Sequence, residues 1–186
     1  MNRLVECVPN FSEGRRPEVV DKIVAALTSV PHVYLLDREM DADHNRAVIT
    51  IVGSPENIGD AAVRGVEVAV RLIDLTKHTG EHPRMGAADV IPFVPIRGIS
   101  LEECVEIAKT VGRQIAERFQ VPVYLYEAAA TRPERKNLEN IRRGQFEGIR
   151  AEIATNPEPS GKKAIEFTRS RLGTSSVQSA LNEPRS

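Results

Sequence analysis

The chain is 186 residues long, with 41% hydrophobic and 27% charged residues, an ordinary composition for one globular domain. A formal net charge of −1 and an aromatic content of 4% without tryptophan give no support to a nucleic-acid-binding protein. Because no apolar run approaches the roughly 20 residues that cross a bilayer, we expect no membrane association.

The N-terminal residues predict a strand followed by a helix. An apolar, β-branched run at residues 3–8 ends at Pro9 and is typical of a strand. Pro17 is suited to the first turn of a helix, and apolar residues recur at helical spacing through Leu27. We therefore expect the first helix there.

A strand pair and a second helix follow. Residues 33–36 and 47–52 have strand character, and the polar stretch at 37–46 is too short for a crossover helix. We predict an antiparallel pair joined by a long polar loop. Ser54 is expected to cap a long amphipathic helix that ends near residues 76–77.

The rest of the chain alternates strand and helix once more before shorter elements. Two prolines make residues 90–96 an edge or irregular strand. A capping-box pattern opens a helix at residues 100–119, and residues 121–126 predict a fifth strand. Short surface helices are expected at residues 133–143 and 145–153.

This order of elements predicts an α+β fold, a mixed β-sheet with helices packed on its outer face, built on a split β-α-β plan. We assign residues 1–153 to one domain. Residues 154–186 are expected to form a polar C-terminal tail that is partly helical or disordered, since breakers and small polar residues dominate it.

Cysteine usage and the N-terminus indicate a cytoplasmic protein. Cys7 and Cys104 lie far apart in apolar contexts, which is typical of buried, reduced thiols rather than of a disulfide framework. The first residues lack the basic and apolar regions of a secretory signal. A cytoplasmic location follows as an expectation.

The densest polar cluster is the loop at residues 78–89. His78 and His82 are four residues apart, a spacing that would place two imidazoles on one helix face for a metal. Gly80 and Pro83 disfavour that helix, and the zinc motifs HExxH and CxxC are missing from the sequence. We therefore expect no metal site.

An acid/base role suits this loop better, because histidine titrates near neutral pH. Glu81, Arg84 or Asp89 could then set the tautomer and charge of the imidazole. The alternative is a loop whose residues only shape a turn, with Arg84 and Asp89 tying it to the sheet. Composition alone favours the turn.

Other polar segments offer weaker signals. Asn45 and Arg46 could hold a carboxylate through the guanidinium fork, or simply belong to a solvated hairpin loop. Residues 10–14 form a further loop, and the basic segment at residues 131–172 is either an anion-attracting surface or a solvated helix face. The phosphate-loop, dinucleotide and nucleophile-elbow motifs are missing, which leaves a small-molecule enzyme or a binding module.

Several motifs in one order nevertheless resemble the N-terminal subdomain of glutamate formiminotransferases, over residues 1 to about 149. They comprise residues 5–14, 45–46, 72–74, 80–87 and 122–126, and the fourth reads GEHPRMGA. In the bifunctional animal enzymes of this family the domain is joined to a cyclodeaminase.

The resemblance implies transfer of the formimino group from N-formimino-L-glutamate to N5 of tetrahydrofolate, a co-substrate, in histidine breakdown. It assigns the acid/base role to His82. We expect the contacts to substrate and folate to come from the following residues: Asn10, Asn45, Arg46, Glu81, Arg84, Met85 and Asp89.

The chain also departs from the family pattern. Catalytic members carry a second subdomain and a connecting segment that residues 157–163 do not reproduce. We expect one half of the active unit, whose C-terminal subdomain is either encoded separately or has been removed at the boundary. The alternative is a non-catalytic folate-binding, ligand-binding or regulatory module. A homodimer is expected, because apolar surface between the two subdomains needs cover.

Overall fold

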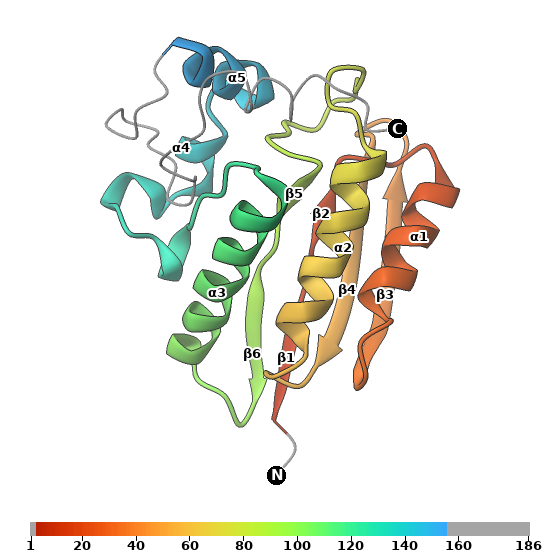
Figure 1. Cartoon of the computed structure of the whole chain (residues 1–186), viewed down its shortest axis with the longest axis vertical. Coiled ribbons are helices and arrows are strands. Elements are labelled where there is room, and N and C mark those ends of the chain that lie inside the picture. The colour runs from red at the N-terminus through yellow and green to blue at the C-terminus, as the bar shows by residue number, and fades with distance from the viewer. Residues whose placement is uncertain (1–2, 156–186) are drawn as a thin grey trace.

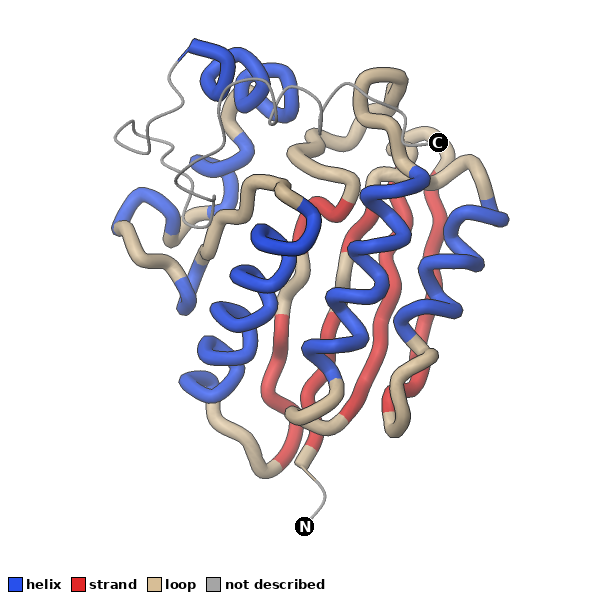
Figure 2. The backbone as a smooth tube through the Cα atoms, viewed as in Figure 1, coloured by secondary structure: helices blue, strands red, loops and turns tan. Residues whose placement is uncertain are grey.

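The computed structural model describes residues 3–155, in which helices lie against one side of a β-sheet (Figures 1 and 2). The strands are β1 Leu4–Cys7, β2 Asn10–Phe11, β3 Val33–Asp41, β4 Arg46–Gly53, β5 Ala88–Val90 and β6 Phe93–Arg97. The helices are α1 Pro17–Leu27, α2 Ile58–Leu72, α3 Leu101–Phe119, α4 Leu138–Arg142 and α5 Gln145–Thr155, with 3-10 turns η1 Glu127–Ala129 and η2 Pro133–Arg135. No helix within residues 3–155 has the length and apolar character needed to cross a bilayer.

Prolines interrupt two rows of the sheet. In the first row, β1 and β2 both pair with β4, and Pro9 lies between them. In the second row, β6 pairs with β1 and β5 pairs with β2, and Pro92 lies between β5 and β6. Proline has no N–H to donate to a ladder, so the regular pairing stops there. One backbone hydrogen bond is made at each interruption: Val8 N donates to Pro92 O at 3.3 Å, and Ile49 N donates to Pro9 O at 3.0 Å.

The topology confirms the α+β class and the split β-α-β plan. Helix α1 connects β2 to β3, and these two strands lie on opposite sides of β4. Helix α2 connects β4 to β5, and these two strands lie on opposite sides of β2. Every pairing among the described strands is antiparallel, so the expected mixture of parallel and antiparallel pairs is wrong. Each helical crossover skips one strand, which leaves antiparallel neighbours.

The core lies between the sheet and helices α1, α2 and α3 (Figure 1). On β4 the inward side chains of Ala47, Ile49 and Ile51 are fully buried, while their outward neighbours remain partly exposed. Gly65 lets α2 approach α1, because a Cβ there would lie 2.5 Å from a methyl carbon of Leu27. The alternation on β4 is the pattern that a sheet covered on one face requires.

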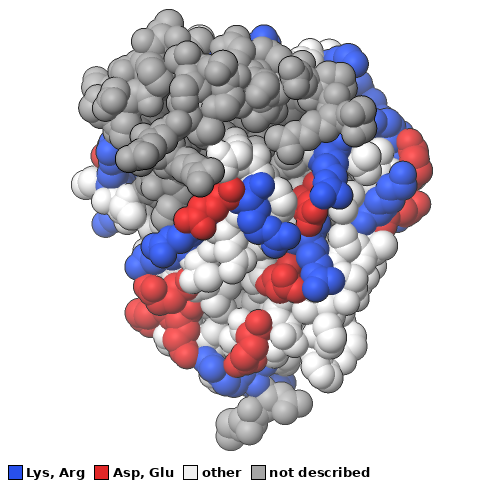
Figure 3. Space-filling model, in the orientation of Figure 1, with Lys and Arg blue, Asp and Glu red and all other residues white. Residues whose placement is uncertain are grey.

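The helix-covered surface mixes both signs of charge (Figure 3). Arg64 pairs with Asp60 at 3.0 Å and Arg71 with Glu67 at 2.6 Å, each one turn apart on α2. Exposed pairs of this kind stabilise a fold by less than about 1 kcal/mol. This view shows no large patch of a single sign.

The long polar loop expected at residues 37–46 is wrong. β3 continues to Asp41 and β4 begins at Arg46, leaving a tight turn in which Asp41 Oδ1 accepts hydrogen bonds from Asp43 N and His44 N, both at 2.9 Å. β3 is an edge strand whose polar side chains face solvent, so the ladder tolerates them.

The bounds of α2 also differ from the expectation. Ser54 does not cap the helix: Asn57 is the N-cap residue, and its side chain donates to Pro31 O at 2.9 Å instead of capping. The helix ends at Leu72 rather than near residues 76–77, because Asp74 Oδ1 accepts from Thr76 N at 3.0 Å and forms a local turn.

The predicted strand at residues 121–126 is wrong as well. The segment has no strand pairing and lines a cavity between α3 and the β5–β6 edge. Its run of apolar residues therefore reflects the lining of this cavity rather than strand pairing. By contrast, the capping box of α3 is confirmed: Glu103 N donates to Ser100 Oγ at 3.2 Å and Ser100 N to a Glu103 carboxylate oxygen at 2.9 Å.

The shorter helices are confirmed in outline. Residues 133–143 contain η2 and α4, and α5 covers the predicted helix at residues 145–153. The predicted tail at residues 154–186 lies, apart from the end of α5, outside the described residues.

Candidate active site

The connections after β2, between β3 and β4, and after α2 meet at one end of the sheet (Figure 1). Asn45 joins them: its Oδ1 accepts a hydrogen bond from Gly14 N at 2.9 Å, and its Nδ2 donates to Thr79 O at 2.9 Å. Asn45 is buried and has a φ of 50°, a left-handed conformation that asparagine adopts more readily than most residues. We call this arrangement the Asn45 clasp.

Two glycines allow the loops to approach so closely. A Cβ on Gly14 would lie 2.0 Å from Asp41 O and 2.5 Å from Arg46 N. A Cβ on Gly80 would lie 2.5 Å from His44 O. Backbone therefore packs directly on backbone at this junction, and a side chain at either position would push the loops apart.

The loop carries a buried histidine beside a buried carboxylate. His82 is 7% exposed, and its Nε2 lies 3.4 Å from Oδ2 of Asp89, whose side chain is 1% exposed. Asp89 lies in β5 at an irregularity in the pairing with β2, and such bulges redirect a side chain. Met85 N donates to the other carboxylate oxygen, Oδ1, at 2.9 Å and closes the loop between the two residues.

A third residue reaches the same carboxylate from a distant part of the chain. Arg142, the last residue of α4, donates through Nη2 to Asp89 Oδ2. This oxygen therefore faces both the imidazole and the guanidinium. The two positions are 53 residues apart in the sequence.

Burial is the largest influence on the titration of His82. It lowers the pKa of the imidazole below its ordinary value, whereas the charge of Asp89 and the hydrogen bond to it act in the opposite direction. The positive charges of Arg46 and Arg142 add to the lowering. A histidine with a lowered pKa is neutral at pH 7 and able to accept a proton.

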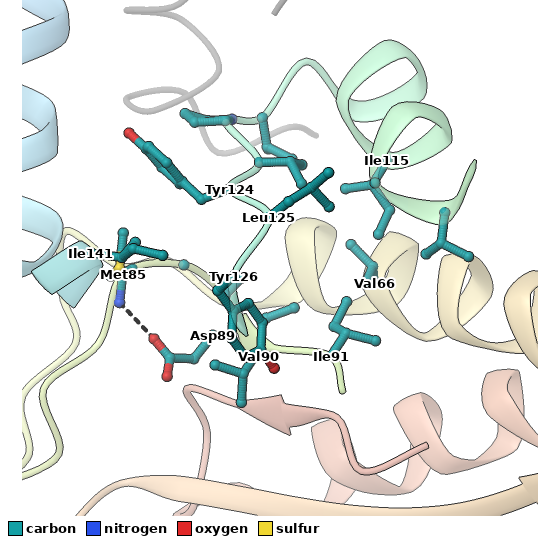
Figure 4. Close-up of a pocket in the computed structure, with 18 of the residues that line it drawn as sticks. Val66, Met85, Asp89, Val90, Ile91, Ile115, Tyr124, Leu125, Tyr126 and Ile141 are labelled. Carbon is teal, nitrogen blue, oxygen red and sulfur yellow. Dashed lines mark hydrogen bonds between the residues drawn. The ribbon is translucent and has the colours of Figure 1, made fainter. Parts of the chain in front are cut away.

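A cavity of about 500 Å³ extends from this carboxylate between α2, α3 and residues 121–126 (Figure 4). Asp89 and Tyr126 lie near each other on one side, and apolar side chains such as Val66, Ile115 and Leu125 line other parts. Burial raises the pKa of Tyr126, so its hydroxyl stays protonated at neutral pH. The cavity lining is thus mostly apolar, and its polar residues include Asp89, which faces His82, as well as others such as Asp74 and Glu127.

Some of the predicted site residues direct their contacts away from the pair of His82 and Asp89. Arg84 turns to α5, where it pairs with Glu147 at 2.7 Å and lies 5.9 Å from the ring centre of Phe146. Glu81 is exposed and holds the loop through its backbone, with Glu81 N donating to Asp43 O at 3.1 Å. Both residues brace the loop in this structure.

Others lie close to the pair. Arg46 begins β4, and its Nε is buried without a hydrogen-bond partner among the described residues. Asn10 lies on β2 opposite Val90, next to Asp89, and its side chain donates to Val8 O at 3.0 Å. Met85 meets Asp89 through its backbone.

Sequence reasoning missed Arg142 and Tyr126. The only signal for Arg142 was the basic segment that contains it, and Tyr126 was assigned to a strand that does not form. Within residues 3–155, no group of three or more acidic, histidine or cysteine side chains is placed to hold a metal.

Comparison with known proteins identifies the family of the chain. The family model described as the formiminotransferase domain, N-terminal subdomain, matches residues 4–178. The chain belongs to the formiminotransferase family. The resemblance found in the sequence motifs is thereby confirmed.

Curated relatives support the assignment to this family. A glutamate formimidoyltransferase of Streptococcus pyogenes serotype M1 is 54% identical over 149 residues, which cover 80% of this chain and 50% of the relative. One from Thermoplasma acidophilum is 51% identical, covering 77% of this chain and 48% of the relative. A formimidoyltransferase-cyclodeaminase of Mus musculus is 51% identical, covering 80% and 28%. The chain thus matches about half the length of the monofunctional relatives and less of the bifunctional one.

Proposed function

We propose that this chain contributes the acid/base half of a glutamate formimidoyltransferase, which moves a formimino group from N-formimino-L-glutamate to N5 of tetrahydrofolate. The supporting observation is the buried pair of His82 and Asp89 in the loop that matches the family motif. The proposal adopts the activity printed for relatives about twice as long as the matched region.

The chemistry requires one proton to move between two nitrogens. N5 of tetrahydrofolate attacks the formimino carbon and forms a C–N bond, giving a tetrahedral intermediate. His82 accepts the proton released from N5 and delivers it to the glutamate nitrogen, whose C–N bond then breaks with the electron pair leaving on that nitrogen. Glutamate and formimino-tetrahydrofolate result.

Asp89 would set the tautomer needed for this exchange. With Nε2–H directed at the carboxylate, the lone pair of Nδ1 is available as a base. The 3.4 Å separation is long for a hydrogen bond, and such contacts often shorten when substrate binds.

Arg46 is the best candidate for a substrate carboxylate. Both substrates carry carboxylates, and a guanidinium binds them through paired N–H groups. The buried Nε of Arg46 lacks a partner in the described part of the chain, and its charge acts on His82. Asn10, Glu81, Arg84 and Met85 remain proposed contacts with weaker support.

Completion of the site would need further surface. The sheet face turned away from the helices exposes apolar side chains, among them Tyr34 at 61% and Val94 at 38%. An exposed apolar surface of this kind marks an interface. We propose that the chain forms a two-fold homodimer and acts together with a second subdomain of the family, which light scattering of the chain alone and mixed with such a subdomain would test.

The proposed setting is the cytoplasm. Both cysteines, Cys7 and Cys104, are free and buried, and burial raises the pKa of each thiol. Protonated, enclosed thiols suit a reducing compartment. Fractionation of cells that express the protein would test this.

The decisive experiment is a transfer assay on the full chain, alone and mixed with a second subdomain from a relative. Formation of the tetrahydrofolate product is followed by its conversion to the methenyl form. Turnover that disappears in His82→Ala supports the proposal. Folate binding without turnover in every mixture would refute catalysis and indicate a ligand-binding module.

A further inference from the structure

The carboxylate of Asp89 is held from two directions besides the imidazole. Met85 N donates a hydrogen bond to Oδ1 at 2.9 Å, and Arg142 Nη2 donates one to Oδ2. Oδ2 is also the oxygen that lies 3.4 Å from Nε2 of His82. We propose that Arg142 is a positioning residue, whose guanidinium fixes the Asp89 carboxylate so that Oδ2 is presented to the His82 ring. This inference rests on the proposed acid/base function of His82.

The geometry explains why a third group is needed. The carboxylate of Asp89 is 1% exposed, so solvent contributes little to it; Met85 N satisfies only Oδ1, and the long contact to the histidine holds Oδ2 weakly. A charge-assisted bond from a planar guanidinium restrains it and compensates its burial. Without Arg142, the side chain of Asp89 would be free to turn toward other donors.

The helix that carries Arg142 is itself anchored. Asn137 caps α4 by accepting a hydrogen bond from Glu139 N at 2.9 Å, and Ile141 is 7% exposed. Nε of Arg142 is buried without a partner among the described residues, so packing and the bond to Asp89 fix the guanidinium. Arg143, the next residue, is exposed.

Arg142 also influences which form of the imidazole is present. The charged groups that act on His82 are Asp89 from β5, Arg46 from β4 and Arg142 from α4. Asp89 favours the imidazolium ion, and the two arginines oppose it. Arg142 therefore adds to the larger effect of burial in keeping His82 neutral beside a carboxylate, which is the form that a base requires.

The test compares Arg142→Met, Arg142→Lys and the matched control Arg143→Met in the full chain. Nuclear magnetic resonance of labelled histidine follows the titration of His82, which is assigned among the four histidines by His82→Gln. In Arg142→Met we expect the pKa of His82 to rise, and kcat to fall roughly 10- to 100-fold in the transfer assay, with the acid limb of the pH–rate profile at higher pH. Arg142→Lys should restore most of the wild-type pKa, and Arg143→Met should match the wild type.

A pKa of His82 that is unchanged or falls in Arg142→Met, in a variant whose thermal unfolding is still cooperative, would overturn the positioning role. If Arg142→Met does not fold, the same comparison is made with Arg142→Lys against the wild type: a shortfall in kcat with a displaced acid limb supports the role, and an unchanged profile opposes it. Failure of the wild type to transfer the formimino group in any mixture would refute the proposed function instead, since the titration is measured without substrate.

Discussion

Replacing Asn45 tests whether this residue builds the site or binds substrate. The sequence suggests a substrate contact, whereas the structure uses both ends of the amide inside the protein, to Gly14 N and to Thr79 O. Asn45→Ala removes both hydrogen bonds and leaves a buried N–H and a partly buried carbonyl without partners. It also places alanine at a φ of 50°.

The expected cost follows from these losses. Two hydrogen bonds contribute about 0.5–1.5 kcal/mol each, and the left-handed conformation costs a residue such as alanine about 1–2 kcal/mol. We expect Asn45→Ala to lower the free energy of unfolding by about 2–5 kcal/mol. Asn45→Gly loses the same bonds but suits the backbone, so it should be less destabilised than Asn45→Ala by about 1 kcal/mol. Asn45→Asp keeps the acceptor for Gly14 N and should fall between the wild type and Asn45→Gly.

Urea denaturation followed by circular dichroism measures all three variants. If the Asn45 clasp positions the loop that carries His82, kcat of Asn45→Ala should fall in the transfer assay along with its stability, because that loop is displaced. A substrate contact predicts instead a raised KM with stability unchanged. An Asn45→Ala protein within about 0.5 kcal/mol of the wild type would refute the clasp, since the structure offers no smaller cost for those losses.

Further expectations concern the histidines and the third helix. His82→Ala should lower kcat roughly 10²- to 10⁴-fold without preventing folding, and an equal loss in His78→Ala together with bound zinc would contradict the acid/base role. Burial lowers the pKa of His82, so just below the ordinary histidine pKa of about 6.5 the unfolded chain binds more protons than the folded chain. The free energy of unfolding should therefore decrease as the pH decreases through that region. Urea titrations at several pH values should show a smaller decrease in His82→Gln than in the wild type. Ser100→Ala removes the hydroxyl that caps α3 and should cost about 1 kcal/mol in the same measurement, with an unchanged midpoint arguing against the cap.

Much of the fold follows from local pattern. Helical spacing gave the start of α1 at Pro17, and the capping box at Ser100 gave the start of α3. Strand bounds were less predictable, because they depend on partners. β3 extends to Asp41 only because β4 offers a ladder there, and residues 121–126 stay unpaired because a cavity separates them from the sheet edge.

The family motif directed attention to the correct loop, but not to the roles within it. Arg84 lies in the motif beside His82, yet its guanidinium binds Glu147 of α5. Charge and position in a sequence do not reveal which of several carboxylates a long arginine side chain will reach. Arg142 shows the converse, since its partner is Asp89 and nothing local in its own helix indicates it.

The pair of His82 and Asp89 therefore depends on elements that are remote from each other in the sequence. The Asn45 clasp holds the start of the loop, the bulge in β5 aims the carboxylate, and α4 supplies the opposing charge. A carboxylate near a buried histidine would by itself favour the imidazolium ion, which cannot accept a proton. Burial of the ring opposes this effect most strongly, and the charges of two arginines add to it, so that one site combines a fixed tautomer with a neutral ring; proton transfer between two nitrogens needs both properties.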